Sequence, residues 1–231
     1  MSYKTYKNLS SNGQYALVQH EAGDTLELWG TESDTFTPLT DTLSNNGVLR
    51  SAKFSYSGDT LVVQRALLGT DELITYVGSP LSKTRFNLTL EGIAANIIAV
   101  SDNSILYTYS TQSNESVLAI WDSTLSKSID LFDFKAIQEY GVHTELTATF
   151  SPDGETFVYG INKGHFHGNV WLRDKTGSSQ MLYGTEGSIN KLAFSPDGKM
   201  IASASDDKKI RIFNLETKEM DVLTGDDGEI L

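Results

Sequence analysis

One short turn motif recurs along this chain and limits what it can fold into. The sequence Phe-Ser-Pro-Asp-Gly at residues 150–154 returns unchanged at residues 194–198, with weaker copies at 54–58 and 9–13 and a worn copy ending at Asn103. The last turn residues are 13, 58, 103, 154 and 198, which gives steps of 45, 45, 51 and 44 residues. A period of this length is typical of repeat proteins that build one supersecondary unit per repeat.

Two apolar runs follow each turn, and both have the length of a β-strand. The first set of runs comprises residues 16–18, 61–63, 106–109, 157–159 and 201–204. The second set comprises residues 26–29, 73–76, 117–122, 170–174 and 210–214. Short apolar runs bounded by Gly, Pro, Asn, Asp and Ser indicate strands joined by tight turns.

Each repeat therefore predicts an inner strand, a turn, a second strand, a loop, a third strand closed by an aromatic residue, and an outer strand. A single sheet of this kind cannot bury both faces, so it must stack on its neighbours around an axis. We predict an all-β fold, a β-propeller of about five four-stranded antiparallel blades in a single domain, residues 1–231. The predicted blades are residues 1–43, 44–90, 91–134, 135–184 and 185–226, with the start of a further inner strand at 227–231.

The repeats resemble those of WD-repeat β-propeller proteins. Residues 189–215 and 117–122 carry the likeness, with Trp121-Asp122 as the dipeptide that names the family. In that family a His after a Gly, a Ser or Thr, the Trp and a loop Asp form a hydrogen-bonded set inside each blade. Here Thr185 and Asp226 stand where that His would be, and Asp207 matches the loop Asp of the fifth blade. The fourth blade, with residues 169–174, is also similar to the propellers of TolB-type and prolyl-peptidase proteins.

Composition and charge exclude several functional classes. The chain has 30 acidic and 18 basic residues and a formal net charge of −12, which repels phosphate backbones and anionic membranes, so direct nucleic-acid binding is not expected. It has no cysteine, which excludes thiol nucleophiles and disulfides. Residues 1–15 lack the apolar core of a signal peptide, and no stretch approaches the length of a membrane span. We expect an intracellular protein, cytoplasmic or nuclear, that makes no membrane contact.

The repeats differ mainly in the loop between the second and third strands. The distance from the last turn residue to the closing position of the third strand is 16, 18, 18, 19 and 15 residues, from 13 to 29, 58 to 76, 103 to 121, 154 to 173 and 198 to 213. The longest loop, residues 162–168, and the long link at residues 133–140, whose composition allows a short helix, should lie at the same end of the propeller. We predict a partner-binding site from the aromatic and histidine residues of this region. These residues are Phe134, Tyr140, His143, His165, Phe166 and His167.

The sequence carries no convincing catalytic motif. It lacks a Gly-x-Ser-x-Gly elbow, a Gly-rich phosphate loop and a His-Glu-x-x-His motif, and Ser188-Ile189-Asn190-Lys191 matches Ser-x-x-Lys without the partner motifs. Three histidines near one loop have a spacing that zinc could use, but neither a carboxylate nor a cysteine accompanies them. We expect no catalytic residues, no metal and no cofactor.

These features favour a protein–protein interaction scaffold, a subunit or domain of a larger assembly that binds other proteins. The alternative is an accessory propeller of a TolB-like or peptidase-type protein that has its catalytic part elsewhere. A ligand-binding axial channel has no supporting residues. Residues 225–230, Gly-Asp-Asp-Gly-Glu-Ile, repeat the pattern of residues 184–189, Gly-Thr-Glu-Gly-Ser-Ile. The propeller is thus expected to be part of a longer protein, a set of blades completed by a partner, or a ring of five.

Overall fold

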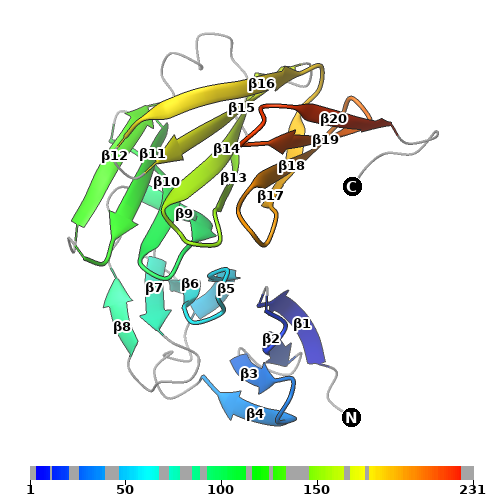
Figure 1. The fold of residues 1–231 in the computed structure, drawn as a ribbon. Helices are drawn as coiled ribbons and strands as arrows, with labels where there is room; N and C mark the ends of the chain where they lie inside the picture. The colour runs from blue at the N-terminus through cyan, green and yellow to red at the C-terminus, as the bar shows by residue number, and fades with distance from the viewer. Residues whose placement is uncertain are drawn as a thin grey trace. The chain divides into compact units, whose positions relative to one another are not determined.

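The described part of the chain consists of twenty β-strands that form five four-stranded antiparallel sheets (Figure 1). The structure, a computed structural model, describes residues 4–10, 12–20, 26–39, 47–67, 73–78, 85–88, 93–112, 116–124, 127–133, 146–163, 167–174 and 177–224. Within these residues there is no helix. The predicted all-β class with four-stranded antiparallel blades is confirmed. The short helix allowed by the composition of residues 133–140 falls outside the described residues, apart from Asp133, which ends a strand.

Each sheet contains four strands that are consecutive in the chain and are paired in chain order. Sheet 1 contains β1 (Lys4–Leu9), β2 (Tyr15–His20), β3 (Leu26–Gly30) and β4 (Thr35–Pro38). Sheet 2 contains β5 (Gly47–Phe54), β6 (Leu61–Leu67), β7 (Leu73–Gly78) and β8 (Arg85–Leu88). Sheet 3 contains β9 (Ile93–Val100), β10 (Ser104–Ser110), β11 (Ser116–Asp122) and β12 (Lys127–Asp133). Sheet 4 contains β13 (Leu146–Phe150), β14 (Thr156–Lys163), β15 (His167–Asp174) and β16 (Ser179–Thr185). Sheet 5 contains β17 (Ile189–Phe194), β18 (Met200–Ser205), β19 (Lys209–Asn214) and β20 (Met220–Thr224).

The chain divides into two compact units. The first is Met1–Asn114 with Ala119–Ile129, and the second is Glu115–Leu118 with Asp130–Leu231. In the first unit, the first strands of sheets 1, 2 and 3 contact one another in order, and in the second unit β13 contacts β17. Within each unit, consecutive sheets are therefore stacked through their first strands, as blades are. The single domain and the blade boundaries stay predictions.

The recurring turn has the same hydrogen-bond network in sheets 4 and 5. The Ser151 hydroxyl accepts a hydrogen bond from Thr156 N (3.0 Å), and the Ser195 hydroxyl accepts one from Met200 N (2.9 Å). Each hydroxyl donates to the aspartate two residues later, and that aspartate accepts the backbone N–H of the residue after the glycine. Gly154 and Gly198 close the turns at positive φ (70° and 72°), which glycine adopts without strain.

Sheets 1 and 2 repeat this network, and their turns also contact the turn of the next sheet. Asn12 Nδ2 donates to the carbonyl of Ser57, and Ser57 Oγ donates to Asp102 Oδ1 (2.6 Å). Each contact joins residues 45 positions apart, which is the repeat length. The turn of sheet 3 is shorter, because Ser101 N donates directly to Ser104 O (2.8 Å) around Asp102 and Asn103.

Strand register shows which residue closes the third strand of each sheet. Trp29 lies opposite Ala16, and Phe213 lies opposite Ile201. The equivalent residue of sheet 2 is opposite Leu61, and it is Gly78. The sequence analysis assigned Tyr76 to this position, which is wrong by two residues. Tyr76 is the nearest aromatic residue in the sequence, but it does not lie opposite Leu61.

In sheet 4, an arginine occupies the closing position of the third strand. Arg173 lies opposite Phe157, and its Nη1 lies 3.5 Å from the carbonyl of Leu131 in β12. Burial raises the pKa of the nearby Tyr159, against the lowering effect of the Arg173 guanidinium. Sheet 4 therefore has a polar contact where sheets 1 and 5 have an aromatic ring.

Within each unit, the cores lie between consecutive sheets. We call the face of a sheet that packs on the following sheet its leading face. In sheet 1 it contains Leu17 opposite Leu28, which pack with Leu61 and Val63 of sheet 2. In sheet 4 it contains two register pairs, Val158 opposite Leu172 and Gly160 opposite Val170.

The leading face of sheet 4 is covered by the next sheet. Val158 and Val170 are fully buried with Ile189, Ile201 and Phe213 of sheet 5. A buried aliphatic side chain contributes about 1.5–3 kcal/mol, so these interfaces supply much of the stability.

Candidate functional site

The predicted partner-binding residues are only partly covered by the structure. Phe134, Tyr140, His143, His165 and Phe166 lie outside the described residues. His167 is described: it is the first residue of β15, lies opposite Lys163 and is exposed. This group of six therefore stays a prediction.

The loop expected at residues 162–168 is shorter than its composition indicates. Asn162 pairs with Gly168, and Lys163 pairs with His167, so these four residues belong to the β14–β15 ladder. The prediction of a loop was wrong at these positions, because a polar residue and a glycine here serve packing between sheets.

Asn162 fixes the first strand of sheet 5. Its buried carboxamide accepts a hydrogen bond from Ile189 N (2.7 Å) and donates one to Ile189 O (3.2 Å). A Cβ atom on Gly168 would lie 2.8 Å from Ile189 Cγ1, and one on Gly160 would lie 3.0 Å from Ile189 Cδ1. The two glycines and Asn162 thus form a seat for Ile189, and Thr185 Oγ1 also lies close to Gly168.

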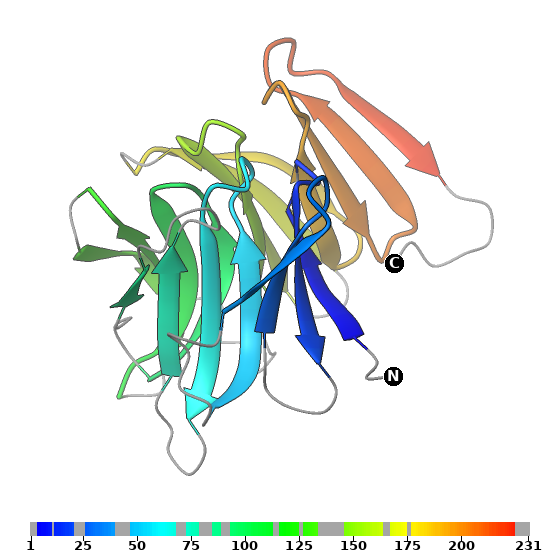
Figure 2. The same ribbon diagram turned by 90° about the horizontal axis from the view of Figure 1, so that it is seen from below.

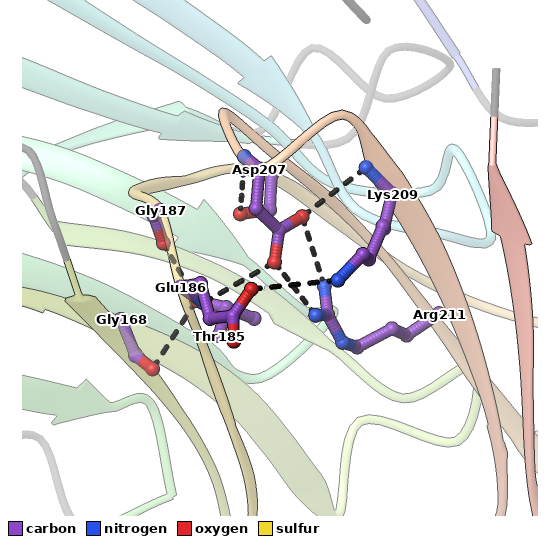
Figure 3. Close-up of polar contacts among 8 residues, drawn as sticks. Gly168, Thr185, Glu186, Gly187, Asp207, Lys209 and Arg211 are labelled. Carbon is purple, nitrogen blue, oxygen red and sulfur yellow. Dashed lines mark hydrogen bonds and ion pairs between the residues drawn. The ribbon is translucent and has the colours of Figure 1, made fainter. Parts of the chain in front are cut away.

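The neighbouring turn of sheet 5 is organised around Asp207 (Figure 3). Its Oδ2 accepts hydrogen bonds from Arg211 Nη2 (2.6 Å) and from Glu186 N (3.2 Å) in the link between β16 and β17. Its Oδ1 accepts from Arg211 Nη1 (3.1 Å) and from Lys209 N (3.1 Å). The Arg211 and Asp207 side chains are 7% and 4% exposed, so this is a buried, bidentate ion pair.

The charge state of Asp207 follows from these contacts. Burial acts to raise the pKa of its carboxyl, but the hydrogen bonds from Arg211 and Glu186 N outweigh burial and hold the pKa below its usual range. Asp207 is the loop aspartate that the WD-repeat resemblance indicates. Its buried side-chain partner is Arg211, which sequence reasoning missed although an Asp and an Arg four residues apart across a tight hairpin are a visible signal.

The link between β16 and β17 lies close against this turn. A Cβ on Gly187 would lie 2.5 Å from Asp207 N, so only glycine permits the approach. The Thr185 hydroxyl lies 2.6 Å from Gly187 O and 3.2 Å from Gly168 O, and it can donate to one of them at a time. Figure 3 shows Thr185, Glu186 and Gly187 on one side of Asp207, with Lys209 and Arg211 on the other.

Charged and polar side chains surround this fixed centre at the end of the sheet. Glu186 lies 3.5 Å from Lys209 Nζ, and Asn190 Nδ2 donates to Asp206 Oδ1 (2.7 Å). We call the exposed residues here the link edge. They are His167, Glu186, Asn190, Lys191, Asp206 and Lys208. The link edge carries both signs of charge, which suits a protein partner better than a phosphate backbone.

Among the described residues, the structure contains neither a cluster of metal ligands nor a membrane-spanning helix. No group of three or more His, Cys, Asp or Glu side chains there is placed to hold a metal ion. No helix among them is long and apolar enough to cross a membrane. The outer strands do expose apolar side chains that the sequence analysis did not single out. They are Phe36, Ile129, Met181, Met220, Val222 and Leu223.

A protein-family model matches one repeat of the chain. Residues 177–214 match the model of the WD domain, G-beta repeat. This range contains β16 to β19 and the whole Asp207–Arg211 centre. The predicted resemblance to WD-repeat propellers is confirmed for this repeat.

Two relatives extend the likeness to more of the chain. The WD repeat-containing protein SL1-17 of Schistosoma mansoni is 25% identical over 54% of this chain and 52% of that protein. The solved structure of TolB from Acinetobacter baumannii is similar with a TM-score of 0.61 and 17% identity, over 99% of this chain and 54% of that one. The TolB likeness shows the β-propeller fold alone. The chain spans about half the length of each of these relatives.

Proposed function

We propose that this chain, which carries a WD repeat and has the β-propeller fold, is a non-catalytic scaffold that binds another protein within a larger intracellular assembly. WD repeats generally mediate protein interactions. One observation carries the proposal for this chain: the link edge places exposed charged residues around a buried ion pair. Backbone that is fixed in this way loses little conformational freedom on binding, which favours affinity.

The link edge and the predicted loop residues form one proposed surface. His167 belongs to both groups, and it begins the strand that carries Gly168 beside Thr185. The aromatic side chains of Phe134, Tyr140 and Phe166 would supply the apolar anchors that charged rims surround in protein interfaces. The charges of Glu186, Asp206 and Lys208 would set partner choice and the rate of association.

A charge-reversal experiment tests this surface. The tagged chain is expressed in cells of its source organism, crosslinked, purified and analysed by quantitative mass spectrometry. We expect Lys208→Glu to reduce recovery of the specific partner by about tenfold, as the loss of an interfacial charge pair does. The matched control is Lys199→Glu, an exposed lysine in the turn at the other end of sheet 5 that lies 2.9 Å from Glu216. Equal recovery with both variants would overturn the placement of the surface.

A second candidate is the accessory propeller of a TolB-like or peptidase-type protein, a role that fits the TolB fold. It predicts that a hydrolase segment or subunit is recovered in stoichiometric amount with the chain. Recovery of non-catalytic partners alone, with no peptide hydrolysis by the purified complex, would exclude it.

A further inference from the structure

The leading face of sheet 5 repeats the leading face of sheet 4 pair by pair. Ala202 lies opposite Ile212 where sheet 4 has Val158 opposite Leu172. Ala204 lies opposite Ile210 where sheet 4 has Gly160 opposite Val170. The equivalent residues in β14 and β18 are 44 positions apart, which is the step between their turns. Sheet 5 is coloured orange to red in Figure 2.

The two faces differ in burial. Val158 and Val170 have no exposed surface, because sheet 5 covers them, whereas Ala202 and Ile210 are partly exposed. Aliphatic side chains have thus been kept on a face of sheet 5 that is less covered than its counterpart. In the first unit, Leu17 and Val62 occupy the place of Ala202 and are also fully buried by the following sheet.

We propose that the leading face of sheet 5 is the docking site for the chain's own residues 227–231, which lie outside the described residues. Ile230 would take the place on sheet 5 that Ile189 takes on sheet 4. The inference concerns the chain itself and does not rest on the partner surface proposed above, although Asp206 belongs to both.

Three observations identify this segment as the occupant. Residues 225–230 repeat both glycines and the isoleucine of residues 184–189. The strand β20 ends at Thr224, six residues before Ile230, and β16 ends at Thr185, four residues before Ile189. Crossing the four strands of a sheet takes three spacings of about 4.8 Å, or about 14 Å, and six extended residues reach about 20 Å. The segment is therefore long enough to return from the outer strand to the first-strand position.

The seat on sheet 5 is chemically different from the seat on sheet 4. Ala204 replaces Gly160, so the seat is shallower by one methyl group. Asp206 stands 44 residues after Asn162, with its carboxylate bound to Asn190 Nδ2. A carboxylate can accept a backbone N–H of the docked strand but cannot donate to its carbonyl. The docked segment would accordingly make one side-chain hydrogen bond to Asp206, whereas Ile189 makes two to Asn162.

Disulfide trapping tests the proposal, since the chain has no cysteine of its own. On sheet 4, a Cβ placed on Gly160 would lie 3.2 Å from Ile189 Cβ, within a few tenths of an ångström of the about 3.5–4.5 Å that a disulfide spans. The full chain with Ala204→Cys and Ile230→Cys should therefore form an intramolecular disulfide under mild oxidation. The matched control is Ser203→Cys with Ile230→Cys, because Ser203 is the preceding residue on the opposite face and is 1% exposed.

We expect the Ala204 pair to close at least about tenfold faster than the Ser203 pair, because exchange rates follow access and proximity. Equal rates for the two pairs would overturn the proposal. A disulfide that forms only between two chains would also overturn it, since the occupant would then be the segment of a second copy.

A second measurement needs no cysteine. Amide hydrogen exchange in β18 and β19 should be faster in Ile230→Asp than in the unmodified chain, and unchanged in Ile230→Val, because only aspartate would carry a charge onto an apolar face. Identical exchange in all three proteins would contradict docking even if a disulfide variant did not fold.

Discussion

The hairpins β14–β15 and β18–β19 occupy equivalent places in neighbouring sheets. The first binds the segment that follows it in the chain, and the second binds the segment that precedes it. Asn162 in the first hairpin holds Ile189, which begins the following sheet. Asp207 in the second hairpin holds Glu186 N, in the link that precedes its own sheet. One device is a neutral amide that satisfies a donor and an acceptor together, and the other is a buried ion pair. The comparison teaches that repeats of one fold can keep their backbone register while changing the chemistry that joins them.

The largest effect is expected from breaking the ion pair of the second hairpin. Asp207→Ala leaves the Arg211 guanidinium buried without its counter-charge, and loss of one partner of a buried pair costs about 3–5 kcal/mol. Chemical denaturation of the variant measures this loss. Asp207→Ala combined with Arg211→Met should recover part of the stability, and a double variant as unstable as the single one would show that the charge is not the cause.

Removing the neutral amide of Asn162 in the first hairpin should lower the free energy of unfolding by less. Asn162→Ala leaves the N–H and C=O of Ile189 without their side-chain partners, and buried unsatisfied groups cost about 1–3 kcal/mol each. We expect a total loss of about 2–3 kcal/mol in the free energy of unfolding. Asn190→Ala, which removes an exposed amide, is the control and should cost less than about 0.5 kcal/mol.

The two sheets should respond alike where their structures agree. Ser151→Ala and Ser195→Ala each remove the hydroxyl that organises the turn, and each should cost about 1 kcal/mol. The loss at Ser151 should be at least as large, because Ser151 is buried and Ser195 is partly exposed. A large loss at only one of the two sites would show that the turns are not equivalent.

The smallest effect, a pH dependence, should separate the two devices. Because the folded-state pKa of Asp207 is lowered, its stabilisation is present above the unfolded-state value and is lost as the pH falls through the folded-state value, below about pH 4. The free energy of unfolding, measured from pH 6 to pH 3, should therefore fall more steeply for the unmodified chain than for Asp207→Asn. Asn162→Ala should keep the slope of the unmodified chain, since an amide does not titrate.

The sequence predicts the architecture well because the recurring turn is a local structure. Serine, aspartate and glycine bond within six residues, so their order in the sequence is enough to locate each turn and the strands beside it. Contacts between sheets are harder to predict. Asn162 and Gly168 have the composition of a loop, and only the position of Ile189 explains why they lie in strands.

The site was predicted less well than the fold. The resemblance to WD repeats indicated Asp207, but the sequence analysis missed its pairing with Arg211, although the spacing of four residues across a tight hairpin is a signal for it. Tyr76 illustrates the same limit, because a shift of two residues leaves the hydrophobic pattern intact while moving another residue into the closing position. Of the six predicted partner-binding residues, the structure describes His167 alone.

The contacts between successive turns have a consequence for how such a chain could grow during evolution. Asn12, Ser57 and Asp102 are linked at intervals of 45 residues, and each uses a polar group that the same place in the next repeat can match. A gene duplication that copied one whole repeat would insert a turn with a ready donor and acceptor on either side. A duplication of half a repeat would place a strand opposite a turn and leave both without partners. The bonding pattern of the turns thus favours change in whole repeats, and it makes the number of repeats easier to alter than their length.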